Sequence, residues 1–456
     1  MSRPTIAERS HPMTEPAAHP ITPDSTIGVV GIGYVGLPIA VAFAEAGLTV
    51  IGVDASPRRL EEIAAGHSPI EDISDERIAA CLAAGLSVAT PESGRLAECS
   101  AIIVCVPTPV TPSKDPDLSP VLSAAETIAA TLRPGQLLVL QSTTFPGTTN
   151  GPFREVIERT GLTAARDFHL AYAPERINPG DPASASANTP RIVGGSTPAA
   201  TERAVALFAR VNAAVVAVAT PEHAEMAKLI ENTFRNVNIA IVNEVAMLCE
   251  RMGMDVWEII DAAATKPFGF MRFTPGPGVG GHCIPVDPYY LAWRARQFDV
   301  TSRFIEIAAD VNIAMPRHVV ELAAEALNER GRALRGARVG VVGVAFKPNV
   351  ADARNTPASD IIAGLRARGA EVAYHDPHVP TFRDPQGVIS ASVPIEQLVA
   401  ASDLLIVVTP HAAIDFDDFY RRAGIVVDTV NSSKGRACRE RSVLRIGAGW
   451  VTPAAA

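Results

Sequence analysis

One segment of the sequence presents a cysteine in a setting suited to chemistry: PGPGVGGHCIPVDPYY, residues 275–290. Four glycines in six residues bring backbone amides close to a neighbour, which favours a bound ligand beside the loop. Cys283 follows these glycines, and Asp287 lies four residues further on. A glycine-rich loop can present a thiol as an exposed nucleophile, whereas a structural cysteine usually lies in an apolar run, as Cys105 and Cys249 do. Position alone leaves both interpretations of Cys283 open.

A lysine and an asparagine share one face of a long predicted helix. Apolar residues recur at spacings of three and four from residue 227 to residue 252, which is typical of an amphipathic helix. Lys228 and Asn232 lie four residues apart beside this stripe, and Asn236 continues their row. A solvated helix face is the usual place for a lysine. Two amides aligned with a lysine beside a core stripe nevertheless favour a lined pocket.

Two further polar residues follow predicted buried strands. Glu175 lies in YAPER, just after the run HLAYAP, and Thr143 lies in QSTTFPGTT after the run QLLVL. In an open α/β sheet, residues beyond the carboxyl ends of the strands face the ligand crevice. We therefore expect both side chains near a ligand, although a carboxylate in such a position can also serve as a helix cap.

A glycine motif of the form G-x-G-x-x-G occupies residues 31–36, between the predicted strand TIGVVG and a helical LPIAVAFAEAG. The glycines permit a tight turn, close approach to a pyrophosphate and helix–strand packing. Asp54 ends the next strand, eighteen residues beyond Gly36, where a carboxylate can bind ribose hydroxyls and repel a 2′-phosphate. The motif alone could be a simple tight turn, but its full context predicts a dinucleotide, with NAD favoured over NADP and FAD as the main rival.

The elements that position these residues fall into three successive regions of the chain, which differ in their pattern of apolar residues. Val/Ile-rich runs alternate with Ala/Leu-rich stretches from residue 26, which predicts a parallel α/β sheet, and the same pattern returns at Arg338. Between them lie the long helix and a second helical pattern from Ser302 to Arg330, with a possible bend at Pro316. GVVGIG at Gly28 is echoed by GVVGVA at Gly340. The sequence thus predicts two related α/β domains around a helical middle.

Composition narrows the class of protein. The formal net charge of -9 argues against broad nucleic-acid binding, and 47% hydrophobic residues are ordinary for a globular chain of 456 residues. The six cysteines form no C-x-x-C pair, so we expect no metal site, no disulfide framework and a reducing, cytoplasmic setting. No apolar stretch reaches the ~18 residues of a membrane span. Residues 1–24 contain five prolines and no apolar core, and we expect a disordered tail.

Taken together, these segments resemble the UDP-glucose/GDP-mannose dehydrogenase family. The similar motifs are GIGYVGLP, VPTP at 106–109, STTFPGTT, YAPERINPGD, AKLIENTFRNVNIAIVNE, GPGVGGHCIPVDP and GVAFKPNVADARNTPASD, in the family's order. The resemblance implies two Rossmann-like doubly wound domains joined by a helical dimerisation domain. We expect an N-terminal NAD domain at 25–219, a central domain at 220–330 and a C-terminal UDP-sugar domain at 331–456.

The resemblance also implies residue roles in a four-electron oxidation of a sugar alcohol to a carboxylate, with two NAD consumed. Cys283 would hold the intermediate, Glu175 would activate water, Lys228 and Asn232 would stabilise an oxyanion, and Asp287 and Thr143 would complete the polar network. NAD binding is implied for Gly31, Gly33, Tyr34, Val35, Gly36, Asp54, Pro107, Thr108, Thr143 and Arg354. Substrate binding is implied for Glu175, Arg176, Lys228, Asn232, Arg272, Gly280, Phe346 and Lys347, with Arg272 reaching across a subunit boundary of a homodimer.

The sugar is suggested by the cysteine loop. Members of the family that act on UDP-glucose usually carry serine or tyrosine before the cysteine and lysine before the aspartate, where this sequence has His282 and Val286. GHCIPVDPYYL looks like the UDP-N-acetylhexosamine branch, with UDP-N-acetylglucosamine as the first choice and the mannosamine, galactosamine and glucose substrates as alternatives. A two-electron dehydrogenase would leave the cysteine loop without a purpose. A non-enzymatic dinucleotide sensor would leave the other polar residues unexplained.

Overall fold

The computed structural model describes residues 21–22, 24–70, 72–176 and 188–451, so the tail expected at 1–24 lies almost wholly outside the described residues. The chain divides into two compact units, Met1–Leu229 and Ile230–Ala456. The helix α7, Pro221–Met252, begins in the first unit and continues in the second. It is the long amphipathic helix expected from the sequence. The division into a tail at 1–24 and domains at 25–219, 220–330 and 331–456 remains a prediction.

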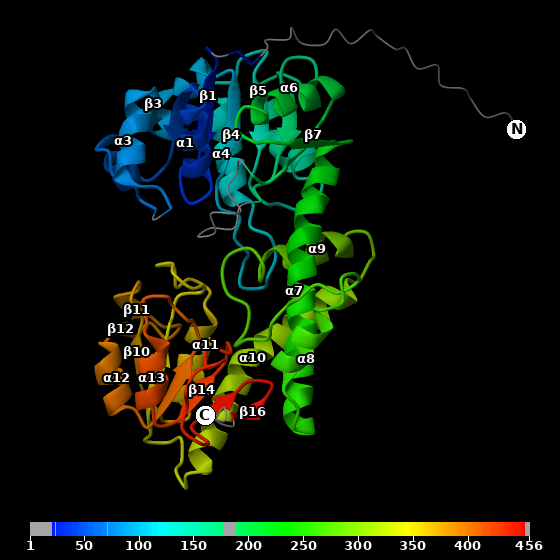
Figure 1. The fold of residues 1–456 in the computed structure, drawn as a ribbon. Helices are drawn as coiled ribbons and strands as arrows, with labels where there is room; N and C mark the ends of the chain where they lie inside the picture. Colours follow the sequence, from blue (N-terminus) through cyan, green and yellow to red (C-terminus); the bar gives the residue numbers. More distant parts are fainter. Residues whose placement is uncertain (1–20, 23, 71, 177–187, 452–456) are drawn as a thin grey trace, which may run out of the picture. The chain divides into compact units, whose positions relative to one another are not determined.

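Within the described residues, the N-terminal unit is built on one sheet in the order β3-β2-β1-β4-β5-β6-β7-β8 (Figure 1). Its strands are β1 (Thr26–Val30), β2 (Thr49–Val53), β3 (Leu86–Ala89), β4 (Ala101–Val104), β5 (Leu137–Leu140), β6 (His169–Tyr172), β7 (Arg191–Gly195) and β8 (Val215–Val218). The strands β3 to β6 in this order are parallel, and β7 pairs antiparallel to β6. The strand order reverses between β1 and β4, which is where an open α/β sheet binds its ligand.

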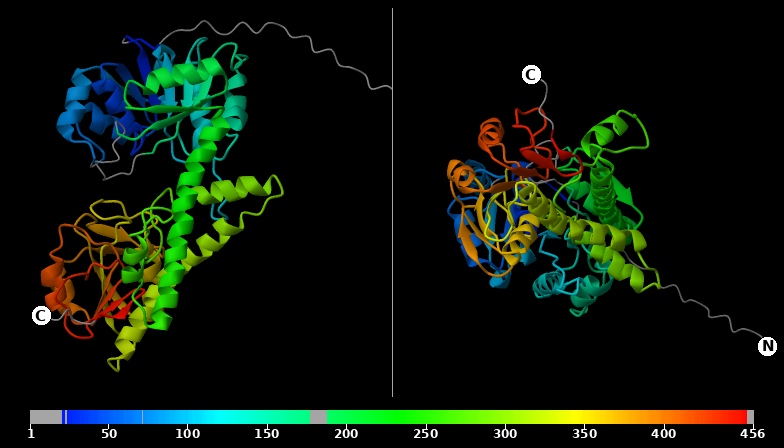
Figure 2. Two further views of the ribbon diagram at one scale, coloured as in Figure 1. Left: turned by 45° about the vertical axis from the view of Figure 1, so that its right-hand side comes forward. Right: turned by 90° about the horizontal axis from the view of Figure 1, so that it is seen from below.

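Helices cover both faces of this sheet (Figure 2). They are α1 (Gly36–Glu45), α2 (Pro57–Ala64), α3 (Asp75–Ala83), α4 (Ser119–Ala129), α5 (Arg154–Glu158) and α6 (Pro198–Phe208). Alternate residues of each strand point to opposite faces, so Val29 packs with the α1 and α6 side while Val30 packs with the α4 and α5 side. Burial on both faces explains why these strands are continuous apolar runs.

The C-terminal unit carries a second sheet, in the order β10-β9-β13-β14-β15-β16. The strands are β9 (Arg338–Val342), β10 (Glu371–His375), β13 (Leu404–Val407), β14 (Val426–Asp428), β15 (Val443–Arg445) and β16 (Gly449–Trp450), and β11 (Thr381–Arg383) pairs with β12 (Ile389–Ala391) apart from them. The helices are α8 (Val256–Ala263), α9 (Asp287–Arg296), α10 (Arg303–Asn328), α11 (Pro357–Ala367), α12 (Ile395–Ala401) and α13 (Phe416–Arg422). The α/β fold expected from the sequence, with two Rossmann-like sheets and helices between them, is confirmed.

The faces of the second sheet have different partners. Val341 and Ile406 belong to a core that includes α10 and α11, whereas Val342 and Val407 belong to a core that includes α12 and α13. Pro316 lies inside α10, where the sequence suggested a bend. The glycine-rich segment expected to interrupt the helical middle lies between α8 and α9. This unit therefore holds the cysteine loop and the second glycine turn together.

Candidate active site

The glycine motif forms the turn between β1 and α1. Gly31 has a φ of +88°, which only glycine adopts readily, and a Cβ on Gly36 would lie 1.9 Å from the Gly31 carbonyl oxygen. A Cβ on Gly33, in contrast, would meet nothing within 4 Å. The first and third glycines are therefore required by the turn itself. The second leaves open space at the N-terminal end of α1, where a pyrophosphate would be bound by backbone amides.

Asp54 follows β2 and is tied to this turn. Its carboxylate accepts hydrogen bonds from the Ile32 N–H (3.0 Å) and the Ser56 N–H (2.9 Å). Arg59 on α2 donates one Nη1 to both carboxylate oxygens, at 3.0 and 2.9 Å. Sequence reasoning missed this arginine, although its position on the first turn of the next helix could have indicated it. The acidic residue expected at the ribose position is present, with a cation beside it.

The next three strands end at the same edge of the sheet as β1, because β1, β4, β5 and β6 are parallel. Pro107 and Thr108 follow β4, Thr143 follows β5, and Glu175 follows β6. Ser142 donates from its hydroxyl to the Val106 carbonyl (2.7 Å), which joins the segments after β4 and β5. The structure thus gathers the predicted residues of this unit along one edge.

Glu175 is held by a buried arginine. The Arg191 side chain, 1% exposed, donates an Nη to Glu175 Oε2 (2.9 Å) and another to the Pro174 carbonyl (2.9 Å). Gln141 and the Arg176 backbone N–H also donate to the Glu175 carboxylate. Glu175 is therefore fixed at the strand end as a hydrogen-bond acceptor. Sequence reasoning missed Arg191, although a charged residue at the start of the apolar run RIVGG could have drawn attention to it.

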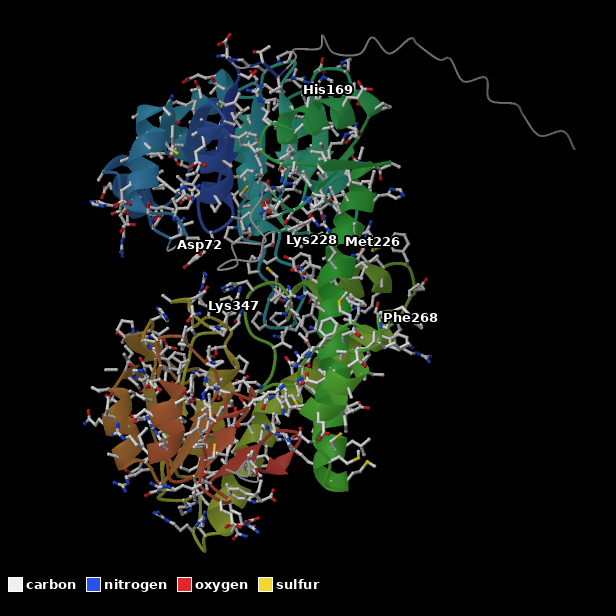
Figure 3. The ribbon with its side chains drawn as sticks, in the orientation of Figure 1. Asp72, His169, Met226, Lys228, Phe268 and Lys347 are labelled. Carbon is white, nitrogen blue, oxygen red and sulfur yellow. The ribbon has the colours of Figure 1, made fainter. Side chains whose placement is uncertain are left out.

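The beginning of α7 is joined to the loop after β5 by a buried carboxylate. Glu225 accepts hydrogen bonds from the Gly147 N–H (2.6 Å), the Thr149 N–H (2.9 Å) and the Thr149 hydroxyl (2.6 Å). Burial raises the pKa of Glu225 to about 7, against the effect of these donors. Lys228 follows three residues later, so it lies on the adjacent turn of the same helix face (Figure 3).

Cys283, in the C-terminal unit, is exposed, whereas the other five cysteines of the chain are buried or half-buried. Burial raises the pKa of Cys99 to about 12 and that of Cys105 further. A thiolate is the reactive form of cysteine, so these two thiols are poor nucleophiles. The structure therefore favours Cys283 as the reactive cysteine over the buried ones.

The cysteine loop is anchored on α7 and α9. The Cys283 carbonyl accepts from the Asp287 N–H (2.8 Å) and the Val286 N–H (3.1 Å) at the start of α9. The Asp287 side chain, 4% exposed, accepts a short hydrogen bond from the Asn232 amide. Asn236 donates to the Ile284 carbonyl at 2.8 Å. Two asparagines of the row expected from the sequence thus hold two residues that follow Cys283, namely Ile284 and Asp287.

The loop also packs against the segment that follows β9. A Cβ on Gly281 would lie 3.0 Å from the Phe346 ring, and one on Gly280 would lie 3.1 Å from the Phe346 Cβ. Asp352 accepts from His282 Nε2 (3.0 Å) and from Arg354 (2.7 Å). These hydrogen bonds hold the pKa of Asp352 far below its usual range, although burial opposes them. The structure therefore brings together Gly280, Cys283, Phe346 and Arg354.

Lys347 is half-buried in the same segment, directly after Phe346 (Figure 3). The segment is fixed from the other side by Asp376, the first residue after β10, which accepts from the Val344 N–H (2.7 Å) and the Ala345 N–H (2.9 Å). His411 bridges Asp376 (3.0 Å) and the Asn349 N–H (3.0 Å). Asp376 and His411 were not expected from the sequence.

Comparison with known proteins identifies the family. The UDP-glucose/GDP-mannose dehydrogenase family matches with its NAD binding domain at residues 25–212, its central domain at 222–314 and its UDP binding domain at 340–434. The chain belongs to this family. It is therefore an NAD-dependent nucleotide-sugar dehydrogenase, and the cofactor expected from the glycine motif and Asp54 is confirmed.

Relatives that are named for different substrates have similar sequence identity to this chain. UDP-N-acetyl-D-glucosamine 6-dehydrogenase of Pseudomonas aeruginosa is 38% identical over 78% of this chain and 83% of its own. UDP-N-acetyl-D-mannosamine dehydrogenase of Pyrococcus horikoshii is 36% identical over 84% of this chain and 89% of its own. The solved structure of UDP-D-ManNAc dehydrogenase from Pyrococcus horikoshii matches with a TM-score of 0.85 at 33% identity, over 93% of this chain and 100% of that chain.

Arg272, expected to reach a substrate, is exposed and paired within its own chain. Its guanidinium donates to Asp261 at 2.8 and 3.1 Å, and Lys434 binds the other oxygen of Asp261 at 2.7 Å. Contact with a substrate would require Arg272 to give up this solvent-exposed ion pair, which solvent screening makes weak.

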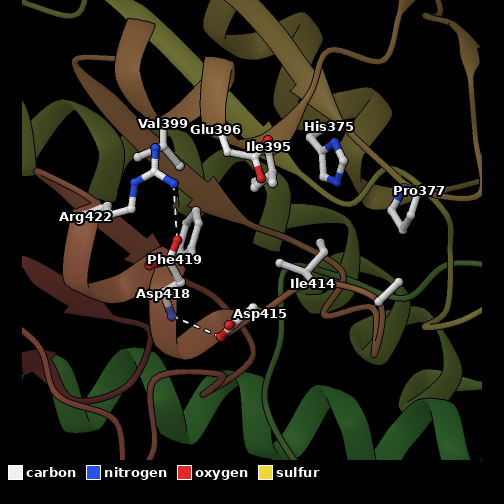
Figure 4. Close-up of a pocket in the computed structure, with 11 residues that line it drawn as sticks. His375, Pro377, Ile395, Glu396, Val399, Ile414, Asp415, Asp418, Phe419 and Arg422 are labelled. Atoms are coloured by element: carbon white, nitrogen blue, oxygen red, sulfur yellow. Dashed lines mark hydrogen bonds and ion pairs between the residues drawn. The ribbon is translucent and has the colours of Figure 1, made fainter.

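A pocket of ≈ 280 Å³ lies on the α12 and α13 side of the second sheet (Figure 4). Its apolar wall includes Ile395, Ile414 and Phe419, and His375 lies beside Pro377. Its charged residues are Glu396, Asp415, Asp418 and Arg422, and Arg422 is paired with Asp418 at 3.1 Å. This excess of carboxylates disfavours a pyrophosphate, so the pocket does not suit the diphosphate of a nucleotide sugar.

Among the described residues, no group of three or more His, Cys, Asp and Glu side chains could hold a metal ion. Across the same residues, no helix combines the length and the apolar character needed to cross a membrane.

Proposed function

We propose that this family member oxidises the C6 alcohol of a UDP-N-acetylhexosamine to the uronate. The observation that carries the proposal is Cys283, the exposed cysteine that follows a glycine-rich segment and precedes two residues held by α7 asparagines. The names of several relatives at 34–38% identity support the N-acetylhexosamine class. A simple two-electron dehydrogenase has no use for an exposed cysteine beside its substrate segment.

The reaction converts one primary alcohol, one water and two NAD into a carboxylate, two NADH and three protons. Two NAD molecules, bound one after the other along the β1 turn, would each accept one hydride. Between the two oxidations the Cys283 thiolate attacks the aldehyde carbon and forms a thiohemiacetal. Loss of the second hydride leaves a thioester, and water releases the carboxylate and regenerates the thiol. The covalent bond keeps the aldehyde from escaping and makes its carbon a hydride donor again.

The other predicted residues support this sequence of steps. Lys228 and Asn232 supply donors where negative charge develops on the substrate oxygen. Glu175, held as an acceptor by Arg191, orients and deprotonates the water that attacks the thioester. Thr143 and Asp287 complete the polar network. Phe346, Lys347 and Gly280 bind the nucleotide sugar, Arg176 and Arg272 assist them, and Arg354 binds a phosphate of NAD.

UDP-N-acetylglucosamine is the first choice of substrate. His282 and Val286 in the cysteine loop differ from the residues of the UDP-glucose branch. UDP-N-acetylmannosamine, UDP-N-acetylgalactosamine and UDP-glucose are the alternatives. An NADH-release screen over these four sugars tests the choice, and we expect the highest kcat/KM for UDP-N-acetylglucosamine. Turnover of UDP-glucose alone would remove the N-acetylhexosamine class.

A homodimer is the expected assembly. One face of α7 exposes five large apolar side chains between 46% and 58%: Ile230, Phe234, Ile241, Leu248 and Met252. Large apolar residues exposed in a row mark a protein interface more often than a free surface. Sedimentation at micromolar concentration should give a dimer, whereas Leu248→Glu should give a monomer. A monomeric unmodified protein would contradict the assignment.

The covalent step can be trapped. Glu175→Gln keeps the side-chain shape but removes the base, so thioester formation should survive while its hydrolysis slows. We expect a burst of NADH followed by slow turnover, and intact-protein mass spectrometry should find a sugar-nucleotide adduct that maps to Cys283. Cys283→Ser should nearly abolish turnover, because an alkoxide forms far less readily than a thiolate. An adduct on another residue would move the nucleophile elsewhere.

A further inference from the structure

Three buried asparagine side chains form a continuous hydrogen-bonded chain beneath the cysteine loop. The Gly276 N–H donates to Asn243 Oδ1 (2.9 Å), and Asn243 Nδ2 donates to Asn312 Oδ1 (2.9 Å). Asn312 Nδ2 then donates to Asn236 Oδ1 (2.9 Å), and Asn236 Nδ2 donates to the Ile284 carbonyl (2.8 Å). The chain thus runs from the start of the glycine segment to the residue directly after Cys283.

The direction of every hydrogen bond in this chain is fixed by its two ends. The backbone N–H of Gly276 can only donate, and the backbone carbonyl of Ile284 can only accept. Each asparagine must therefore turn its oxygen toward Gly276 and its nitrogen toward Ile284. The three side chains are between 0% and 5% exposed, so water cannot replace a lost partner at low cost. Each member thus depends on all the others.

The chain also joins the cysteine loop to two helices at once. Asn236 and Asn243 lie seven residues apart on α7, on one face, and Asn312 lies on α10. Gly278 has a φ of +129°, and a Cβ there would lie 3.4 Å from both the Asn312 carbonyl oxygen and the Pro316 ring. Pro316 has no N–H to give to the carbonyl four residues earlier, so α10 leaves room for the loop to approach Asn312.

We propose that Asn236, Asn243 and Asn312 are positioning residues that set the place of the Cys283 thiol through this directed chain. The proposal rests on Cys283 being the nucleophile. None of the three touches the reacting carbon. They act through the backbone on both sides of the glycine loop, because the loop itself is rich in glycine and would otherwise sample many conformations. A displacement of about 1 Å at a reacting atom can cost about a hundredfold in rate.

Asn312→Asp tests the chain with almost no change of shape. The new carboxylate oxygen would face Asn236 Oδ1, so an acceptor would meet an acceptor in the middle of the chain. Asn328→Asp is the matched control, because Asn328 is an exposed asparagine on the same helix. We expect amide exchange across residues 276–287 to be at least about tenfold faster in Asn312→Asp. We also expect kcat to fall about tenfold or more while KM for NAD stays within about twofold.

Asn236→Asp provides a second variant in case Asn312→Asp fails to fold, because it breaks only the final link, to Ile284. It should change amide exchange near Cys283 and lower kcat while leaving exchange at Gly276 closer to that of the unmodified protein. If these variants and Asn328→Asp have the same rate of amide exchange across residues 276–287 and the same kcat, the proposal is overturned. Full turnover by Cys283→Ser would instead show that Cys283 is not the nucleophile. The amide exchange rates would still test whether the three asparagines hold the cysteine loop.

Discussion

The two sheets of the molecule begin with the same turn and close it differently. GVVGIG runs from β1 into its turn and GVVGVA runs from β9 into its turn, and the two align so that Gly33 corresponds to Ala345 and Gly36 to Pro348. In the first turn one amide, that of Ile32, is bound by Asp54, and the space at Gly33 stays open. In the second turn two amides are bound by Asp376, the residue after the equivalent strand.

The two turns are therefore suited to different roles: the first to binding an anion and the second to holding a segment of the protein in place. Backbone amides at such a turn attract an anionic ligand, and in the second sheet the protein's own carboxylate already satisfies them. His411, from the segment after β13, binds the same carboxylate oxygen as these two amides. The second turn is thus closed to a pyrophosphate, and its following residues, Phe346 and Lys347, are held in one place. The same motif thus leaves amides available for the predicted cofactor site in one domain and fixes a segment in the other.

The largest effect should come from removing the second carboxylate. Asp376→Ala would leave the Val344 and Ala345 amides and His411 without their common acceptor in a site 2% exposed. We expect a loss of about 3–5 kcal/mol in the free energy of unfolding. Asp54→Ala should cost less, about 1–3 kcal/mol, because it leaves one buried amide, that of Ile32, without its acceptor and its Arg59 partner is 38% exposed. Urea unfolding measures both, and equal losses would contradict the comparison.

The next effect distinguishes the glycines of the first turn. Gly36→Ala would place a Cβ 1.9 Å from the Gly31 oxygen and should impair both folding and NAD binding. Gly33→Ala has free space around it in the protein, so stability should fall by less than about 1 kcal/mol. Its NAD affinity should nevertheless drop about tenfold to a hundredfold, because the methyl group occupies the path of the pyrophosphate. Calorimetric titration with NAD tests this split, and unchanged affinity would place the pyrophosphate elsewhere.

A smaller effect concerns cofactor choice. Asp54→Ala should narrow the preference for NAD over NADP by about tenfold, because Arg59 is released and can meet a 2′-phosphate. Arg59→Ala in the same background is the control and should lose the gained NADP activity. The ratio of kcat/KM values for the two cofactors measures the change. Comparable values in the unmodified protein would reject the role of Asp54.

Much of this architecture could be predicted from local sequence signals. The strands buried on both faces, the turn at Gly31 and the helix from Pro221 all carry periodic apolar patterns or glycine motifs. The edge strands β3 and β8 were not predicted. Each has only four residues and is partly exposed, and although β8 (VVAV) is apolar, so short a run cannot be distinguished from a helical segment by its periodicity. Family resemblance supplied the site residues. Their supports, such as Arg191 and Asn312, come from distant parts of the chain, and no local pattern reports a long-range hydrogen bond.

The smallest effect is a pH dependence that nearly cancels within the N-terminal unit. Burial raises the pKa of Glu225 to about 7 from an ordinary 4.5, and burial with a nearby Arg203 lowers the pKa of His169 to about 4 from 6.5. His169 begins β6, at the sheet edge opposite the strand ends that carry the site (Figure 3). The two groups thus titrate over overlapping pH ranges with opposite consequences for stability.

Between pH 4.5 and 6.5 the folded protein keeps the Glu225 proton that the unfolded chain releases, so this group makes stability fall as pH rises. Over the same range the unfolded chain protonates His169 while the folded protein keeps it neutral, so stability rises as pH rises. We expect a nearly flat unfolding free energy for this unit. Glu225→Gln should expose a rising slope, and His169→Phe a falling one, of about 1 kcal/mol per pH unit. Hydrogen exchange resolved by peptide measures the unfolding free energy of the N-terminal unit within the full chain. The double variant should be flat again, and parallel slopes in the two single variants would show that neither group titrates as its burial requires.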